Sequence, residues 1–479
     1  MSNAALNYHS HVVDILGNTL GRDQPVMILD KALELISLLD DKLFEDNDVV
    51  FFDPFCKAGE ILLACALKRC LKKNSKRKLL SLNAIEKELY ESNRYFGLAL
   101  DERHHKISLR TFLGNTRSHK KKYTQLIRNG NYLSEIDGSL NKPIFEKEFS
   151  SMIEYIQKTS GKTRIIAVGN PPYQESDDGF GASAKSIYNF FAESLIKNEN
   201  ISEFVLVIPA RWFSGGKGLQ EFRDSIRNTK HLENLRYFSK ANDVFPTVAI
   251  SGGICFFHYN KSYIGPTQFT DDSNSEVIDF AEFEIIPDDT LSFPIIRKIH
   301  SYWKGDFVGD IAWASKPFGI RTNHFSKNPK TLKKDKNIVA VLSRGRTTQY
   351  THKDKIIKNQ DKINLWKVCI PKAYGASKSL PINQIFLVNK GTITTETYNV
   401  INTFKNKEEA ENLIIYLQTD FARYMLGLRK ISQDVPPDRW NWVPYMDTSK
   451  VWTDKELFKY FKISKEEQEH IKKKVKEWT

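Results

Sequence analysis

The sequence is poor in cysteine, and its cysteines form no metal-binding pattern. Only five occur in 479 residues, and no two of them stand at the spacing of a zinc site. We expect buried or incidental thiols in a reducing compartment, and we expect no bound metal. The five are Cys56, Cys65, Cys70, Cys255 and Cys369.

Long apolar runs are also missing. The N-terminus lacks a basic stretch followed by an apolar one, so no signal peptide is predicted. No uncharged apolar stretch is long enough to cross a bilayer, which argues against a membrane protein. Hydrophobic residues still make up 41% of the chain, enough for packed cores, and the length allows two to three domains. We therefore expect a folded cytoplasmic protein.

Acidic residues are outnumbered by basic ones. The formal net charge is +13, and the segment from Lys327 to Lys378 is crowded with lysine and arginine. A surplus of this size favours a polyanionic partner, which a protein binds through phosphate contacts and counterion release. The alternative is a basic surface without a partner, and charge alone does not decide between the two.

Short apolar runs alternate with helical patterns in the first half of the chain. This order is typical of a parallel α/β sheet, which binds ligands beyond the carboxyl ends of its strands. We predict a Rossmann-like α/β domain over residues 1–265, with residues 117–161 as an insertion. A mixed α+β domain over 270–445 and a helical tail over 446–479 follow. The predicted strands are 49–52, 81–85, 164–168, 204–208 and 254–258, and the predicted helices are 26–39, 60–71, 89–100, 408–426 and 464–478.

Polar residues follow the predicted strands 49–52 and 81–85, and a third lies at residues 113–115, where we expect a further strand of the sheet to end. Asp53 opens a loop whose carboxylate can accept hydrogen bonds from an ammonium group, and Gly59 in the same loop lets a bulky ligand approach the backbone. Glu86 ends the second predicted strand, where an acidic side chain suits the two hydroxyls of a ribose. Asn115, which we place after the third strand, can read an adenine edge, although it fits an ordinary turn equally well.

The tetrapeptide Asn170-Pro171-Pro172-Tyr173 follows the predicted strand 164–168. Two prolines remove two backbone donors and fix the direction of the chain, so carbonyl oxygens and the Asn170 amide oxygen are left as acceptors. Acceptors placed on both hydrogens of an exocyclic amine free its lone pair to attack the methyl group of a sulfonium. Tyr173 offers a flat face on which an extruded base can stack. The plain alternative is a polyproline-like turn.

These residues resemble the adenine-specific amino-methyltransferases of restriction–modification systems, and most closely their TaqI-like subgroup, which has a C-terminal specificity domain. The resemblance extends over nearly the whole chain. It rests on residues 169–174, 181–184, 187–188, 208–213, 215–219, 244–246, 252–257 and 452–454.

The resemblance implies S-adenosylmethionine as cofactor. Asp53, Phe55 and Gly59 would line its methionine end, Glu86 would hold its ribose, and Asn115 would hold its adenine. Two residues depart from the family. Lys57 stands where a glycine or small residue is usual, and Asn115 stands where an aspartate is common.

The resemblance also implies the acceptor chemistry. Asn170 and the carbonyl of Pro171 would activate the N6 amine of a flipped-out adenine in double-stranded DNA, and Tyr173 and Phe245 would sandwich the base. Beyond the family, we expect a separate restriction endonuclease as partner. In the basic segment the candidates for base or phosphate contacts are Arg344, Arg346, Gln349 and Tyr350, unless this is only a solvated basic loop.

Other interpretations of the sequence stay open. Protein-glutamine and some ribosomal RNA methyltransferases resemble the chain at the same tetrapeptide, because amide and amine nitrogens need the same acceptors. They usually lack a large basic C-terminal domain, so residues 270–445 favour DNA. A second alternative is a DNA-binding subunit that no longer catalyses.

Overall fold

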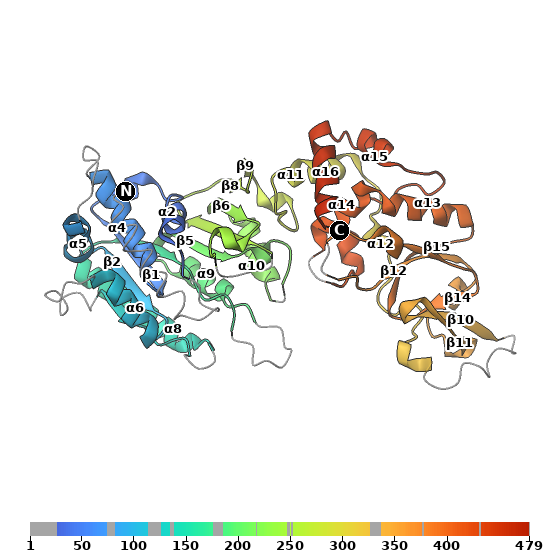
Figure 1. Cartoon of the computed structure of the whole chain (residues 1–479), viewed down its shortest axis with the longest axis horizontal. Coiled ribbons are helices and arrows are strands. Elements are labelled where there is room, and N and C mark those ends of the chain that lie inside the picture. The colour runs from blue at the N-terminus through green and yellow to red at the C-terminus, as the bar shows by residue number, and fades with distance from the viewer. Residues whose placement is uncertain are drawn as a thin grey trace. The chain divides into compact units, whose positions relative to one another are not determined.

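A computed structural model of the protein describes residues 26–73, 82–113, 126–134, 138–175, 185–216, 218–246, 250, 252–325, 337–375, 378–430 and 433–478. The chain forms two compact units, Met1–Thr290 and Leu291–Thr479 (Figure 1). The division lies beyond the boundary predicted at residues 265–270, because two further strands, β8 and β9, continue the sheet of the first unit.

A nine-stranded sheet is the centre of the first unit. Its strand order is β3-β2-β1-β4-β5-β7-β6-β8-β9. The strands from β3 to β5 pair in parallel, whereas β7 is antiparallel to both of its neighbours. The prediction of a Rossmann-like α/β fold is thus confirmed. The strands are β1 Val49–Cys56, β2 Tyr95–Ala99, β3 Ile127–Asn129, β4 Arg164–Gly169, β5 Ile201–Pro209, β6 Leu232–Phe238, β7 Ile254–Asn260, β8 Thr267–Thr270 and β9 Ser275–Ile278.

Helices flank this sheet, as Figure 1 shows. Strand β1 is buried at every position, which is the pattern of a parallel strand covered on both faces and explains its continuous apolar run. The helices are α2 Leu29–Ile36, α3 Asp41–Glu45, α4 Glu60–Lys73, α5 Leu82–Glu91, α6 Glu102–Leu113, α8 Lys142–Ser160, α9 Tyr188–Lys197 and α10 Gln220–Asn228.

The structure corrects the predictions between β1 and β4. Residues 82–91 form α5 where a strand was predicted, and β2 occupies part of the predicted helix 89–100. Strand β3 pairs with β2, so part of the predicted insertion 117–161 belongs to the sheet. These strands have five and three residues, and apolar runs that short do not distinguish a strand from a buried helical segment.

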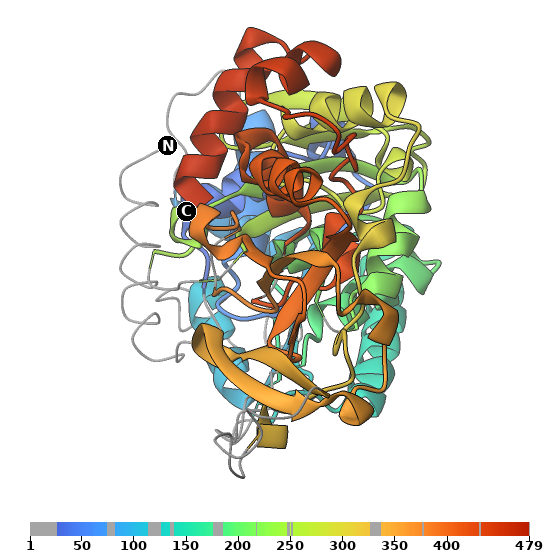
Figure 2. The same ribbon diagram turned by 90° about the vertical axis from the view of Figure 1, so that its right-hand side faces the viewer.

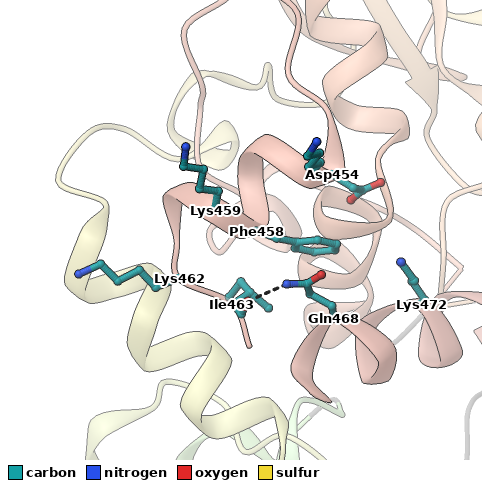
Figure 3. Close-up of a pocket in the computed structure, with 8 residues that line it drawn as sticks. Asp454, Phe458, Lys459, Lys462, Ile463, Gln468 and Lys472 are labelled. Carbon is teal, nitrogen blue, oxygen red and sulfur yellow. Dashed lines mark hydrogen bonds between the residues drawn. The ribbon is translucent and has the colours of Figure 1, made fainter. Parts of the chain in front are cut away.

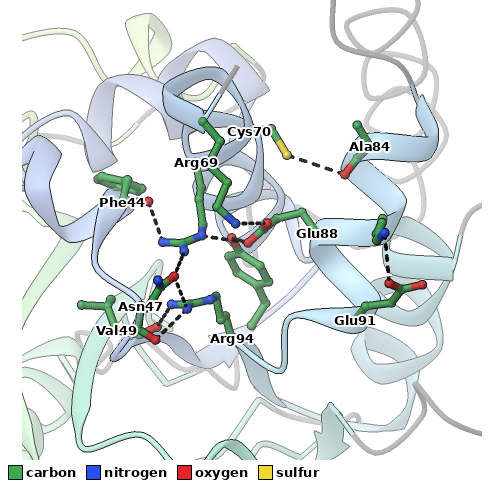
Figure 4. A network of polar contacts seen from close by, with 12 residues as sticks. Phe44, Asn47, Val49, Arg69, Cys70, Ala84, Glu88, Glu91 and Arg94 are labelled. Atoms are coloured by element: carbon green, nitrogen blue, oxygen red, sulfur yellow. Dashed lines mark hydrogen bonds and ion pairs between the residues drawn. The ribbon is translucent and has the colours of Figure 1, made fainter. Parts of the chain in front are cut away.

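Buried arginines fix the start of β1 (Figure 4). The Arg69 guanidinium of α4 donates to Asn47 Oδ1 at 2.9 Å and pairs with Glu88 of α5 at 3.0 Å. Arg94 donates to the carbonyl oxygens of Asn47 at 2.6 Å and Val49 at 2.8 Å. These bonds join α4, α5 and the segment before β2 to the first residues of β1, and so orient the strand whose other end carries the candidate site.

The second unit contains two three-stranded sheets, ordered β11-β10-β14 and β13-β12-β15, together with helices. Figure 2 shows β10 and β11 as a paired ribbon. The strands are β10 Ile338–Ser343, β11 Thr347–His352, β12 Trp366–Pro371, β13 Phe386–Val388, β14 Thr392–Thr394 and β15 Tyr398–Phe404. The helices are α11 Ser292–Tyr302, α12 Val308–Ile311, α13 Lys407–Gln418, α14 Asp420–Arg429, α15 Asp454–Tyr460 and α16 Lys465–Trp478.

The mixed α+β character predicted for this region is confirmed, with one change. The predicted helix 408–426 is two helices, α13 and α14, that meet at Thr419. The Thr419 side chain accepts a hydrogen bond from the amide of Ala422, so it caps α14 and starts a new helix instead of continuing the old one.

Candidate active site

The end of β4 packs directly on the end of β1, its neighbour in the sheet. A Cβ atom on Gly169, the last residue of β4, would lie 2.7 Å from Cδ2 of Phe55 and 3.1 Å from Oδ1 of Asp53. Both distances are shorter than ordinary contacts, so only glycine fits here without a shift. Asn170 follows immediately. The structure therefore brings the predicted catalytic loop against the predicted cofactor loop.

Strand β1 continues through Asp53 to Cys56, so the loop predicted to open at Asp53 is only residues 57–59, and two carboxylates are buried on either side of it, at the end of β1 and the start of α4. Asp53 accepts a hydrogen bond from the amide of Phe55 at 2.9 Å, and Glu60 accepts one from the amide of Ala58 at 3.2 Å. Burial raises the pKa of Asp53 well above its usual range, and the charge of Glu60 raises it further. Gly59 adopts a φ of 77°, which a side chain would strain. Negative groups thus lie on either side of a loop whose backbone a ligand can approach closely.

Lys57 lies in the same loop and is also buried, with 2% of its surface exposed. Its Nζ is 5.7 Å from the centre of the Tyr173 ring. Burial lowers the pKa of Lys57 to about 7, although the charges of Glu60 and Asp53 oppose this effect. A lysine ammonium thus lies between the predicted cofactor loop and the predicted catalytic loop.

The tetrapeptide itself is largely buried. Asn170 is 1% exposed, Pro171 and Pro172 are buried, and Tyr173 is half-buried. Burial raises the pKa of Tyr173 well above its usual range, and its hydroxyl has no hydrogen-bond partner among the described residues. The backbone oxygen of Tyr173 accepts from the amide of Ile187 at 3.1 Å, which anchors the end of the loop.

Tyr173 and Phe245, the predicted base-stacking pair, are in contact. Their ring centres are 6.4 Å apart, and the planes meet at 65°, edge to face. A base stacked between two parallel rings needs roughly 7 Å between them, which is two contacts of about 3.5 Å. The rings are therefore brought together as the sequence predicts, but they must turn before a base can lie between them.

Glu86 does not lie where the sequence predicted. It belongs to α5 and does not end a strand. The acidic residue beyond β2 is Asp101, which is 1% exposed. Its Oδ1 accepts from the backbone amide of His104 at 2.8 Å and lies 2.7 Å from His104 Nδ1. Burial alone would raise the pKa of Asp101, but these hydrogen bonds hold it below its usual value.

His104 is the residue that sequence reasoning missed at this point. Its ring is completely buried, and its Nε2 has no hydrogen-bond partner among the described residues. Burial lowers the pKa of His104, and the charge of nearby Lys57 lowers it further, while Asp101 opposes both. The sequence does contain a signal for this pair. Asp101 directly follows the apolar run 95–100 and stands three residues before His104.

Asn115 lies outside the described residues. The residues that lead to it form α6, so no strand ends there. The third strand ends instead at Asn129, whose side-chain oxygen accepts from the amide of Asn131 at 3.0 Å and whose amide nitrogen donates to Glu102 at 2.9 Å. The position assigned to Asn115 is therefore held by Asn129.

In the second unit, Arg344–Arg346 forms the turn between β10 and β11. Gly345 and Arg346 have φ angles of 71° and 60°, as tight hairpin turns require. Arg344 and Arg346 are exposed, and the Arg346 guanidinium lies 4.4 Å over the ring of Phe386. Gln349 and Tyr350 lie on β11 and are half-buried. The four predicted contact residues thus share one hairpin.

Not every basic residue of the segment 327–378 is available to a partner. Lys367 has no exposed surface, and its Nζ donates to the carbonyl oxygens of Ile363 at 2.7 Å and Leu365 at 2.8 Å. It supports the sheet from inside, so the expectation that it contacts phosphate is wrong. Lys333 and Lys334 lie outside the described residues.

A pocket of about 530 Å³ lies between α15 and α16 (Figure 3). The carboxylate of Asp454 accepts from the backbone amides of Asp420 at 3.0 Å and Phe421 at 2.9 Å, so this acid serves to cap α14. Four lysines make the remaining lining positive, which does not suit a cationic ligand. The lining residues are Asp454, Lys455, Phe458, Lys459, Lys462, Ile463, Gln468 and Lys472.

Two classes of feature are missing from the part of the chain that the structure describes. None of its helices combines the length and the apolar character needed to pass through a bilayer. No three of its histidine, cysteine and carboxylate side chains gather as a metal site would require.

Known proteins resemble the chain in sequence and in fold. A protein of Mycoplasma pneumoniae described as an uncharacterized adenine-specific methylase is 34% identical over 107 residues, which cover 21% of this chain and 25% of that relative. Among solved structures, the Type IIL restriction-modification enzyme MmeI in complex with DNA superposes with a TM-score of 0.43 at 10% identity, covering 91% of this chain and 66% of MmeI. The Type ISP enzyme LlaBIII bound to DNA gives 0.42 at 11% identity, covering 91% and 38%.

The structural similarities are too distant to specify an activity, but the sequence matches are more specific. The chain spans only 25% of the length of the relative from Mycoplasma pneumoniae. The family model described as Eco57I restriction-modification methylase matches residues 93–245, a range that contains Asp101, the tetrapeptide and Phe245. This match confirms the resemblance predicted from the tetrapeptide: residues 93–245 have the sequence of an Eco57I restriction-modification methylase domain.

Proposed function

We propose that the protein is a site-specific DNA methyltransferase that transfers a methyl group from S-adenosylmethionine to the N6 amine of adenine. The observation that carries the proposal is the close approach at Gly169, where the last residue of β4, directly before the tetrapeptide, packs against Asp53 and Phe55 at the carboxyl end of β1. Parallel strands β1 and β4 are neighbours, so a donor held by one loop reaches an acceptor held by the other.

The residues of the first loop fit the proposed donor in most respects. Buried carboxylates at Asp53 and Glu60 complement its positive charges, and the φ of 77° at Gly59 allows close approach of the backbone. Beyond β2, Asp101 replaces Glu86 as the carboxylate for the ribose hydroxyls. Lys57 alone has the wrong charge for a cationic ligand.

When bound, S-adenosylmethionine supplies an electrophilic methyl group on a sulfonium. Asn170 Oδ1 and the carbonyl of Pro171 would each accept one hydrogen of the target amine, so that its lone pair points at the methyl carbon. The carbon–nitrogen bond would form as the carbon–sulfur bond breaks, and the nitrogen would then release one proton to solvent. Tyr173, with Phe245 turned to face it, would hold the extruded base by stacking.

The second unit would supply DNA recognition. The Arg344–Arg346 hairpin is narrow, positively charged and exposed, as a groove- or phosphate-contacting element requires. The substrate would then be double-stranded host DNA in the cytoplasm. A separate restriction endonuclease would be the expected partner enzyme. RNA and protein glutamine are the competing acceptors for the same tetrapeptide chemistry.

The experiment is transfer of a labelled methyl group from S-adenosylmethionine to DNA, RNA or protein, followed by identification of the modified residue. We expect N6-methyladenine in DNA, and we expect Asn170→Ala and Tyr173→Ala to abolish it while DNA binding is largely kept. Retained activity in Asn170→Ala would show that the catalytic loop is assigned to the wrong residues. If the label appears only in RNA or only in protein, the methyl acceptor is that molecule and not DNA.

A further inference from the structure

We propose that Lys57 distinguishes the cationic methyl donor from the neutral sulfide product, because it gives up its ammonium proton to solvent when the donor binds. The inference rests on the proposed function and concerns the same site. It explains how a buried lysine is tolerated beside a ligand of like charge.

The position of Lys57 would set its charge against that of a cationic donor bound beside Tyr173. Lys57 lies on the loop between β1 and α4, is 2% exposed, and holds its Nζ 5.7 Å from the ring centre of Tyr173. The methyl group must pass between that loop and the tetrapeptide loop that contains Tyr173. Two unit positive charges within about 6 Å inside a protein repel each other by several times the thermal energy.

Loss of the Lys57 ammonium proton removes this repulsion at a low cost in free energy. The ammonium has little room to move into solvent, because the side chain is buried and its Nζ lies near the ring of Tyr173. Burial has already moved the pKa of Lys57 to about 7, so little further change is needed to make the amine neutral. After methyl transfer the sulfide carries no charge, and the amine is free to take a proton back.

Other titratable groups lie near Lys57, and the protons they release have to be distinguished from the Lys57 proton. Asp53 comes from β1 and Glu60 from α4, and both have raised pKa values that a bound cation would lower. His104, paired with Asp101 at the start of α6, feels the charge of Lys57. Tyr173 contributes its ring face. Any of the acids, or His104, is a rival source of released protons.

The test is calorimetric binding of S-adenosylmethionine and of S-adenosylhomocysteine to the full-length protein, in buffers of different ionisation enthalpy between pH 6 and pH 8. We expect up to about one proton released with the cationic ligand near pH 6, falling as pH rises, and clearly fewer with the sulfide. Affinity for the cationic ligand is expected to fall about tenfold from pH 8 to pH 6, and affinity for the sulfide to change less.

Lys57→Met should remove the proton release and the difference between the ligands, whereas Lys72→Met, which deletes an exposed lysine of α4 paired with Asp41, should keep both. Release that persists in Lys57→Met would assign it to Asp53, Glu60 or His104 and overturn the inference. Equal release with both ligands in the unchanged protein would also overturn it, even if Lys57→Met did not fold. Binding of neither ligand at any pH would instead refute the proposed function, and the inference with it.

Discussion

Gly169→Ala tests the contact that brings the two loops together. The added Cβ would lie 2.7 Å from Cδ2 of Phe55 and 3.1 Å from Oδ1 of Asp53. The first distance is roughly 1 Å shorter than a normal carbon–carbon contact, and Phe55 cannot retreat freely because its ring packs against Phe191 with centres 4.9 Å apart. Overpacking of this kind costs about 1–3 kcal/mol of folding stability.

The effect on turnover should exceed the effect on stability. Asn170 is the next residue, so a shift at Gly169 is passed directly to the group that orients the target amine. A displacement of about 1 Å at a reacting centre reduces the rate roughly 100-fold. Urea denaturation gives the change in free energy of unfolding, and single-turnover methylation gives the change in rate.

Two further variants separate packing from general damage. Gly161→Ala places a side chain at a φ of 65° with no atom within 4 Å, at the end of α8. It should cost about 1 kcal/mol through backbone strain and leave single-turnover methylation unchanged. Phe55→Leu combined with Gly169→Ala should recover at least about 0.5 kcal/mol relative to the sum of the single changes. A Gly169→Ala protein with unchanged stability and rate would refute the argued contact.

The other predictions concern the recognition hairpin and the buried ion pairs. Arg344→Ala should weaken DNA binding and lower the slope of log affinity against log salt by about one unit, as measured by fluorescence anisotropy across a salt series. An unchanged slope would mean that Arg344 contacts no phosphate. Arg69→Met should cost about 1–3 kcal/mol in urea denaturation, because the carbonyl oxygens of Phe44 and Asp46 would lose a buried donor, whereas Glu88 keeps Lys73 at 2.9 Å. The surface change Lys72→Met should reduce the free energy of unfolding much less than Arg69→Met, because its ion pair with Asp41 is exposed to solvent, and equal losses would contradict this argument.

The parts of the fold that the sequence predicted are those with strong local signals. Strand β1 was found because Val49 to Phe52 is a continuous apolar run, but the strand continues through Asp53 and Pro54 to Cys56, beyond the predicted end at residue 52. The segments of β4, β5 and β7 were found in the same way. The tail helix was recognised from charged helical spacing, and it forms α16.

The second strand shows why the rest was not predicted. A strand was predicted over residues 81–85, but α5 begins at Leu82, whereas β2 carries Gly97, an unusual strand residue. The reason for Gly97 is tertiary, since a Cβ there would lie 3.1 Å from Sγ of Cys56 on β1. No local pattern reports that contact. Because β2 was missed, the carboxylate expected after the second strand was placed at Glu86, whereas the acidic residue that follows β2 is Asp101.

The candidate site follows from sheet order more than from sequence spacing. Asp53 and Asn170 are far apart in the chain, yet β1 and β4 are adjacent and parallel, so the residues at their carboxyl ends must meet. The residues between them build β2 and β3 on the other side of β1, where they supply Asp101 without separating β1 from β4. Insertions in that stretch would therefore leave the contact at Gly169 intact, whereas one added methyl group on Gly169 itself would not.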